Sequence, residues 1–328
     1  MKKNRIILLS LLILSLISIF IGVSSGSADI RLSELWLIFT TDIHSEYSNV
    51  IFELRLPRVF TAFAVGGLLA VSGVLMQVLL RNPLAEPYIL GSSGGAAVAA
   101  LLAMSFGLGS IWIDISAFSG SLLATLLVFG IASKSANWGP TRLLLTGVVL
   151  ASGFSAITTL ILALSSEQTV RGMLFWMMGD LSFAYYPEHL IYLLITITIS
   201  TIFLSRYFDI LSRGEVQASI VGIEVHFFRL LIFSITALAT ALSVTAVGVI
   251  GFVGLVVPHT VRLLIGSKHK YVIPASALLG GVLLVISDTI ARTVLAPRQL
   301  PVGALTALIG VPLFILLMRK SLARGQLR

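Results

Sequence analysis

The chain has little charge and no cysteine. Of its 328 residues, 57% are hydrophobic and 11% are charged, and the mean hydropathy is +1.04. A soluble domain of this composition would expose a large apolar surface, so an ordinary water-soluble protein is excluded. Without cysteine, a disulfide framework, a thiolate metal site and a cysteine nucleophile are excluded too. The polar stretches are too short for a core of their own, and we expect one polytopic membrane domain over residues 1–328.

Motifs of ATP hydrolysis and metal binding are also missing. No G-x-x-x-x-G-K-[ST] occurs, so any ATP that drives this protein binds a separate subunit. The five histidines show no H-E-x-x-H or other metal-ligand spacing. No series of acidic or histidine side chains follows the apolar segments, as a proton-coupled carrier would need. We expect no cofactor and no metal in this chain, and a solute path lined by neutral side chains.

The sequence does contain many apolar runs of membrane-spanning length. About 20 residues cross the hydrocarbon core. The candidate runs are 6–23, 58–80, 88–106, 111–132, 142–164, 190–205, 229–247, 250–265, 272–293 and 302–318. They predict an all-α membrane protein with about ten transmembrane helices. A signal peptide is the alternative for the first run, because MKKNR precedes it and SSGSA follows it, but the run is long for one.

The basic residues predict the orientation, because cytoplasmic loops are enriched in lysine and arginine. With ten spans and both termini in the cytoplasm, the inside residues are Lys2, Lys3, Arg5, Arg81, Lys134, Arg142, Arg206, Arg213, Arg229, Arg262, Lys268, Lys270, Arg319, Lys320, Arg324 and Arg328. The outside residues are Arg31, Arg55, Arg58, Arg171, Arg292 and Arg298. This bias explains the net charge of +8 without nucleic-acid binding.

Two features could carry chemistry inside the membrane. Ser93 stands in the G-x-S-x-G pattern of serine hydrolases, but the sequence shows no strand before it. We favour a packing face in which Gly91 and Gly95 let two helices approach closely. Asp288 and Arg292 are four residues apart near the outer end of the ninth run, where one helical face would let them pair. A structural ion pair and a functional role both remain open for them.

Two loops could contact partners. The inside loop 206–228 is the longest cytoplasmic connection, and Gly214 interrupts it before a short helix carrying Glu215, Ala218 and Gly222. It is a candidate contact for a cytoplasmic subunit, with a solvated loop as the alternative. On the outside, Arg55 and Arg58 precede the second span, and Arg292 and Arg298 project from the last outer loop. Arginine suits bidentate carboxylate pairing, and interfacial snorkelling is the alternative.

Nearly the whole chain resembles the FecCD-type permeases of ABC importers for iron-siderophores, haem and cobalamin, which have the type II importer fold. The matching stretches are LRLPR (54–58), SGVLMQ (72–77), RNPLAEPYILGSSGGA (81–96), FWMMGDL (175–181), GEVQASIVG (214–222), GFVGLVVPHTVR (251–262), SDTIAR (287–292) and LPVGALTALIGVPLF (300–314). The most specific of them are RNPLAEPYILGSSGGA and GFVGLVVPHTVR.

The resemblance implies a multi-pass permease of the bacterial inner membrane that is not itself an enzyme. It implies a homodimer, two cytoplasmic ATPases that use ATP-Mg, and a binding protein that docks outside. By position, Gly214, Glu215, Ala218 and Gly222 become ATPase-coupling contacts, and Arg55, Arg58 and Arg292 become docking contacts, with Arg298 added as a further candidate. Met178, Gly179, Asp180 and Leu181 fall where the family places a short outer helix beside the path, although Asp180 stands where serine is more usual.

Several points stay open at this stage. An iron-siderophore or haem is the favoured cargo, with cobalamin as the alternative. A secondary transporter and a membrane hydrolase built on Ser93 are the competing classes. Whether Glu86, in the inside turn between the second and third spans, contacts the ATPase is also open.

Overall fold

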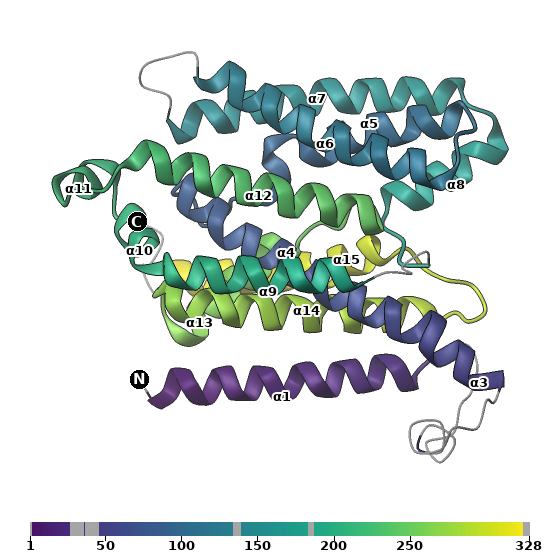
Figure 1. The fold of residues 1–328 in the computed structure, drawn as a ribbon, viewed down its shortest axis with the longest axis horizontal. Coiled ribbons are helices and arrows are strands. Elements are labelled where there is room, and N and C mark those ends of the chain that lie inside the picture. Colours follow the sequence, from purple (N-terminus) through teal and green to yellow (C-terminus); the bar gives the residue numbers. More distant parts are fainter. Residues whose placement is uncertain (1, 27–35, 37–45, 134–138, 183–186, 324–328) are drawn as a thin grey trace.

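The computed structural model describes residues 2–26, 36, 46–133, 139–182 and 187–323, and these residues form helices and no strand (Figure 1). A helix coincides with each predicted span: α1 (Lys2–Ser24), α4 (Leu56–Leu79), α5 (Ser92–Ser105), α6 (Ser110–Ser133), α7 (Pro140–Leu164), α9 (Glu188–Phe203), α12 (Val225–Val247), α13 (Val253–Ile265), α14 (His269–Thr293) and α15 (Val302–Ala323). The all-α prediction is confirmed. Arg31, Lys134, Arg324 and Arg328, which entered the orientation argument, lie outside the described residues.

These helices differ in length and apolar composition, and therefore in whether each could cross a membrane alone. Among the described residues, six are long and apolar enough to cross alone, and α9 joins α10 (Ser205–Leu211) in a pair bent by 64°. The shorter apolar helices are α5, α13 and the Val302–Leu317 part of α15. Two of them begin at breaks inside the protein: α5 follows the 3₁₀ turn η2 (Pro87–Leu90), and α13 follows the break at residues 248–252.

Four further short elements lie within the described residues. The short helix α3 (Glu46–Asn49) and the π-helix η1 (Val50–Arg55) lead directly into α4, so the continuous apolar helix runs from Tyr47 to Leu79. Pro57 lies in the first turn of α4, where η1 passes into the α-helix. The helices α8 (Glu167–Met177) and α11 (Glu215–Ile220) lie outside the predicted spans.

The helices are arranged around α4, whose residues are almost all buried from Val59 onward. Figure 1 shows α5 to α8 on one side of the molecule and α1 at the opposite edge. Large apolar side chains remain exposed on α7, among them Leu145, Val149 and Leu160, with 59%, 70% and 62% of their surfaces exposed. An exposed apolar surface of this kind suits lipid or another membrane subunit.

Close helix packing in this bundle depends on glycine. Helices in a membrane gain little from the hydrophobic effect, so they associate through close contact between small residues. A Cβ atom added at Gly66 of α4 would lie 2.2 Å from the carbonyl oxygen of Gly280 of α14, and one added at Gly280 would lie 2.3 Å from that of Gly66. Similarly, a Cβ atom added at Gly95 of α5 would lie 2.4 Å from the Gly120 carbonyl oxygen of α6. The predicted packing role is confirmed for Gly95.

Replacing Gly66 with valine is therefore expected to force α4 and α14 apart and lower the stability by about 1–3 kcal/mol, the usual range for overpacking. Thermal unfolding of the purified chain in detergent measures this effect. Gly153→Val on α7 is the matched control, because a Cβ there meets nothing within 4 Å. Equal melting temperatures for the two variants would contradict the packing argument.

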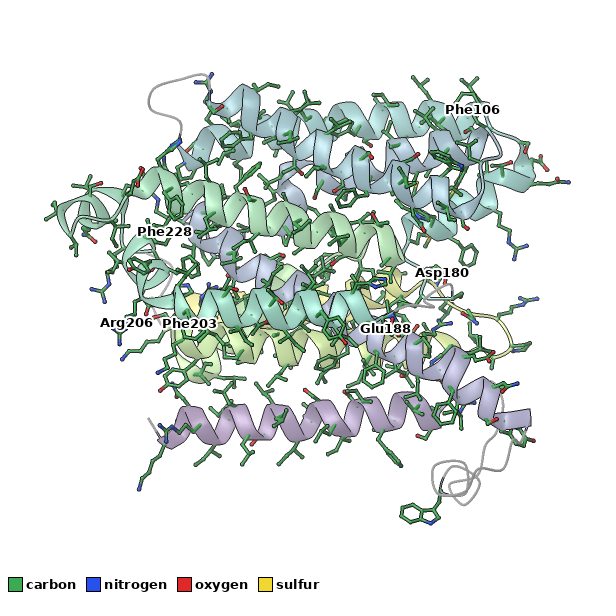
Figure 2. All side chains as sticks on the ribbon, viewed as in Figure 1. Phe106, Asp180, Glu188, Phe203, Arg206 and Phe228 are labelled. Atoms are coloured by element: carbon green, nitrogen blue, oxygen red, sulfur yellow. The ribbon has the colours of Figure 1, made fainter. Side chains whose placement is uncertain are left out.

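Polar side chains gather at two opposite ends of the bundle. One end, the coupling end, holds the N-terminus of α1, α10, α11 and the junction of α13 with α14, where the Asn4 amide donates to the Ile265 carbonyl at 3.2 Å. The other end, the outer end, holds the C-terminus of α14 and residues 178–182. Figure 2 shows Arg206 and Phe228 toward the coupling end, and Asp180 and Glu188 toward the outer end. Arg206, predicted inside, and Asp180, predicted beside the outer helix, thus lie at opposite ends of the described structure.

Candidate functional site

The predicted coupling segment 206–228 folds into α10, α11 and the start of α12. Figure 1 shows α11 projecting from the coupling end of the bundle. Gly222 has a φ of +82° and ends α11: its N–H donates to the Ser219 carbonyl at 2.9 Å, and the Ile223 N–H donates to the Ala218 carbonyl at 3.0 Å. A glycine closes a helix in this way at little steric cost.

The faces of α11 differ. Ala218 is fully buried, whereas Val216, Ile220 and Val221 are 74%, 79% and 66% exposed. Three exposed apolar side chains on a short helix at the end of the molecule form a surface that a partner protein could cover.

Glu215 fixes α11 to the rest of the chain. Its carboxylate pairs with Arg229 of α12 and accepts a hydrogen bond from Arg81 at 2.5 Å, and Arg81 lies just after α4. Two chain segments are thereby connected to the first residue of α11. The sequence placed Glu215 in the coupling segment but did not reveal its two arginine partners. Arg81 and Arg229 are 134 and 14 residues away, and no motif connects them with Glu215.

The predicted gate residues Met178, Gly179, Asp180 and Leu181, called the gate segment below, do not form the short outer helix. The helix α8 ends at Met177, and the gate segment follows it as irregular chain. The Asp180 N–H donates to the Val247 carbonyl of α12 at 2.9 Å. On the other side, the N–H groups of Val302 and Gly303 donate to the carbonyls of Gly179 at 3.2 Å and Met178 at 2.9 Å. The gate segment is therefore held between the end of α12 and the start of α15.

A cavity of about 680 Å³ opens beside the gate segment at the outer end. Its polar lining includes Asp180, Arg171 and Arg298, and its apolar lining includes Phe175 and Leu295. The cavity brings a predicted gate residue, Asp180, together with a predicted docking residue, Arg298, which is exposed. In the sequence, Arg171 was used only to predict the orientation of the chain in the membrane. It reaches the cavity wall because it lies on α8.

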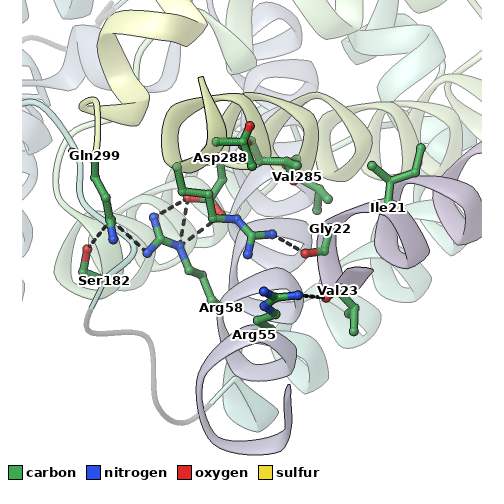
Figure 3. A network of polar contacts seen from close by, with 12 residues as sticks. Ile21, Gly22, Val23, Arg55, Arg58, Ser182, Val285, Asp288 and Gln299 are labelled. Carbon is green, nitrogen blue, oxygen red and sulfur yellow. Dashed lines mark hydrogen bonds and ion pairs between the residues drawn. The ribbon is translucent and has the colours of Figure 1, made fainter. Parts of the chain in front are cut away.

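Asp288 is the centre of a polar network at the outer end, which Figure 3 shows from close by. Its side chain is 1% exposed, and the Arg58 guanidinium donates to it at 2.8, 3.0 and 3.1 Å. The predicted pair with Arg292 is present at 3.5 Å. Arg58 also donates to the Gln299 side-chain oxygen at 3.1 Å, which accepts from Ser182 at 3.0 Å. The network thus connects α4, α14 and the residue after the gate segment.

Arg55 and Arg292 are buried, with 4% and 6% of their surfaces exposed. Arg55 donates to the carbonyls of Val23 and Ser24 at 3.0 Å each, and Arg292 donates to the Gly22 carbonyl (Figure 3). These are the free carbonyls at the end of α1, which need donors. The expectation that Arg292 projects from the outer loop is wrong, because it lies in the last turn of α14. Docking by any of the four arginines stays a prediction.

The pattern around Ser93 does not have the geometry of a nucleophile elbow. Gly91 has a φ of +73° and follows the 3₁₀ turn η2, where a hydrolase would have a strand. Gly91 therefore turns the chain into α5. A Cβ atom added there would lie 3.5 Å from the nearest atom, so of the two glycines predicted to form a packing face only Gly95 lies in close contact.

Residues 11–320 match the FecCD transport family. The chain is 36% identical over 326 residues to the hemin transport system permease protein HmuU of Yersinia pestis, with 97% of each chain covered. It is 34% identical over 324 residues to the vitamin B12 import system permease protein BtuC of Escherichia coli, covering 98% of this chain and 97% of BtuC. These two relatives are named for different cargoes, although their identities to this chain are similar.

Solved structures agree with this relationship. The fold matches a structure described as an inward-facing conformation of a metal-chelate type ABC transporter, with a TM-score of 0.85, 32% identity, and 96% of this chain and 99% of that chain covered. PsaBC from Streptococcus pneumoniae shares the fold at a TM-score of 0.58 and 17% identity, covering 82% of this chain and 93% of that chain. The resemblance seen in the sequence motifs is confirmed: the chain is a multi-pass membrane protein, a permease subunit rather than an enzyme, and it belongs to the FecCD transport family.

Proposed function

We propose that this chain is the permease subunit of an ATP-driven importer that moves an organic metal chelate into the cytoplasm across the bacterial inner membrane. The full-length match to permeases named for hemin and vitamin B12 carries this proposal. The permease forms a homodimer, receives its cargo from a binding protein outside, and works with two cytoplasmic ATPases that use ATP-Mg. No chemistry on the cargo is required of it.

The coupling end faces the cytoplasm in this proposal, with both termini on that side. The supporting observation is the group of basic residues at this end, since Arg81, Arg206, Arg213 and Arg229 lie within α10 or on the segments next to α10 and α11. The exposed apolar side chains of α11 then face the ATPase, with Gly214, Glu215, Ala218 and Gly222 shaping the helix. ATP-driven movement of α11 would switch the path between its outward-open and inward-open forms.

The binding protein docks at the outer end, and the exposed Arg298 is the best-placed of the predicted contacts. Arg298→Glu is expected to weaken docking about three- to tenfold at low salt, because a favourable charge pair becomes a repulsive one. The loss should shrink as salt is raised, since exposed charges are screened. Titration of the binding protein against the reconstituted permease measures it, with Arg319→Glu at the other end of α15 as the control. Equal affinities for both variants would rule out Arg298 as a contact.

The cargo is an iron-siderophore or haem in this proposal, with cobalamin as the alternative that the relatives also support. Uptake of haemin, a ferric hydroxamate siderophore and cyanocobalamin, each measured with the cognate binding protein, separates these cargoes. Transport of cyanocobalamin alone would favour the alternative.

A further inference from the structure

The loop between α4 and η2 enters the bundle instead of remaining at the coupling end. It starts at Arg81, which follows α4, and runs through Glu86 into η2, and it is called the re-entrant segment (Arg81–Leu90) below. Its first residue is exposed, whereas Ala85, Pro87 and Leu90 are buried. Part of this loop therefore lies within the protein, where its polar groups need partners.

The first end of the re-entrant segment is bound to α11. Arg81 has a φ of +47°, which is uncommon for a residue with a side chain, and its guanidinium lies 2.5 Å from the Glu215 carboxylate. Arg229 of α12 pairs with the same carboxylate. Movement of α11 therefore acts directly on the start of the segment.

The second end is bound to the break between α12 and α13. The Glu86 carboxylate accepts a hydrogen bond from the Phe252 N–H at 2.9 Å, and the Tyr88 hydroxyl accepts one from the Ile250 N–H at 3.4 Å. Phe252 has a φ of +69° and precedes the first residue of α13, so the carboxylate faces the positive end of that helix. Because α13 has 13 residues, Phe252 lies roughly 20 Å from Ile265 at the coupling end.

Close contacts prevent the re-entrant segment from moving independently of α4 and the start of α13. A Cβ atom added at Gly254 would lie 2.5 Å from Cδ of Pro87, and one added at Gly73 of α4 would lie 1.9 Å from the Gly254 carbonyl oxygen. The re-entrant segment, α4 and the start of α13 are thus in direct contact. A displacement of the segment is passed on to the break, since close-packed groups do not compress.

The same break holds the gate segment. The Val247 carbonyl accepts from the Asp180 N–H, and a Cβ atom at Gly248 would lie 2.1 Å from the Trp176 carbonyl oxygen at the end of α8. Residues 247–252 therefore contact the gate segment on one side and Glu86 with Tyr88 on the other. An unbroken series of contacts leads from α11 to the gate segment.

We propose that the re-entrant segment is the mechanical link between α11 and the gate segment, and that Glu86 is its positioning residue. The inference rests on the proposed function, since it assigns a route for ATP-driven movement within this chain. Glu86 acts through the Phe252 N–H and does not need to contact the ATPase or the cargo. The link predicts that movement of α11 changes the surroundings of the gate segment, and the test measures that movement.

The test uses the assembled transporter with its ATPase and binding protein in proteoliposomes. The chain has no cysteine, so a single introduced cysteine reports on one place. Gly172→Cys puts it on α8, ahead of the gate segment, where a side chain meets nothing within 4 Å. Gly109→Cys, equally free, is the control in the turn between α5 and α6. The rate of reaction with an impermeant maleimide is compared between the nucleotide-free and vanadate-trapped states.

We expect the reaction rate of Gly172→Cys to change at least about threefold between the two states, and that of Gly109→Cys to stay constant. Added to Gly172→Cys, Glu86→Ala should abolish this change and lower the uptake per ATP hydrolysed at least about tenfold, because the Phe252 N–H loses a charged acceptor. Glu86→Gln should retain the rate change and the uptake per ATP hydrolysed within about threefold, since the glutamine amide oxygen accepts the same hydrogen bond from the Phe252 N–H. A purely structural role would instead lower the amount of assembled protein.

Arg81→Ala tests the first end of the re-entrant segment. Because Arg81 is exposed, this variant should assemble even if Glu86→Ala does not, and the link stays testable. Arg81→Ala should also reduce the rate change seen with Gly172→Cys. A normal rate change and normal uptake in Glu86→Ala or Arg81→Ala would overturn the link, and so would a constant rate in a Gly172→Cys complex that imports cargo. A parent complex without ATP-dependent import would overturn the proposed function itself, and the link with it.

Discussion

Replacing Asp288 with alanine is expected to remove most of the protein from the membrane. The carboxylate is buried and compensates two arginines, Arg58 and Arg292, of which the second is itself buried. Removing one partner of a buried ion pair costs about 3–5 kcal/mol, because the remaining charge stays without compensation. That is a large part of the stability of an ordinary protein. Quantitative detection of the chain in membranes, together with thermal unfolding in detergent, measures the loss.

The double variant Asp288→Asn with Arg292→Gln is the informative control. It removes a charge of each sign and keeps polar side chains at both positions, so it should be more stable than Asp288→Ala. If Asp288→Ala accumulates to the parent level and melts at the parent temperature, then the network is not what holds α4, α14 and the end of α1 together.

Reversing the charge at the first residue of α11 is expected to abolish productive transport while leaving the protein in the membrane. Glu215→Lys places a third positive charge beside Arg81 and Arg229, which should displace α11 from its position on the bundle. Because α11 lies at the surface, the transmembrane helices should remain folded. Uptake in the assembled transporter should fall at least about tenfold, as expected when a favourable charge cluster becomes repulsive, whereas the ATPase activity that remains should no longer respond to the binding protein.

Glu224→Lys gives the same change of charge in the same segment. Glu224 is exposed, and the described part of the chain has no ion pair at it. If repulsion from the ATPase surface were the cause, both variants would lose transport equally. Restored uptake in the charge-swapped pair Glu215→Lys with Arg81→Glu would identify the ion pair as the cause. The ion-pair explanation would be contradicted if neither this swap nor the one with Arg229→Glu restored uptake and Glu224→Lys also lost transport.

The sequence predicted the helices well because their signal is local. Each run of apolar residues long enough to cross the membrane became a helix, including the interrupted run 250–265, whose Pro258 lies inside α13. The pairing of Asp288 with Arg292 was also predictable, since residues four apart on one helix share a face. Family motifs assigned a coupling role to residues 214–222 and a gate role to residues 178–181, and both roles stay predictions.

Contacts between distant segments could not be predicted in this way. The sequence shows that Arg55 and Arg292 stand near the ends of spans, but not that the end of α1 offers its free carbonyls to them. Likewise, Glu86 looks like a residue of a short polar turn until the break before α13 presents the Phe252 N–H to it. In both cases the partner is a backbone group, which carries no signature in the side-chain sequence.

The most direct test of the account is cargo uptake into proteoliposomes that contain this chain, its ATPase and its binding protein. The cargoes are haemin, a ferric hydroxamate siderophore and cyanocobalamin, each offered on the side of the binding protein. The account predicts that one of them accumulates only when ATP and Mg²⁺ are supplied to the ATPase, and that accumulation stops with vanadate. Accumulation driven by an ion gradient without ATP or the ATPase would contradict it and favour a secondary transporter.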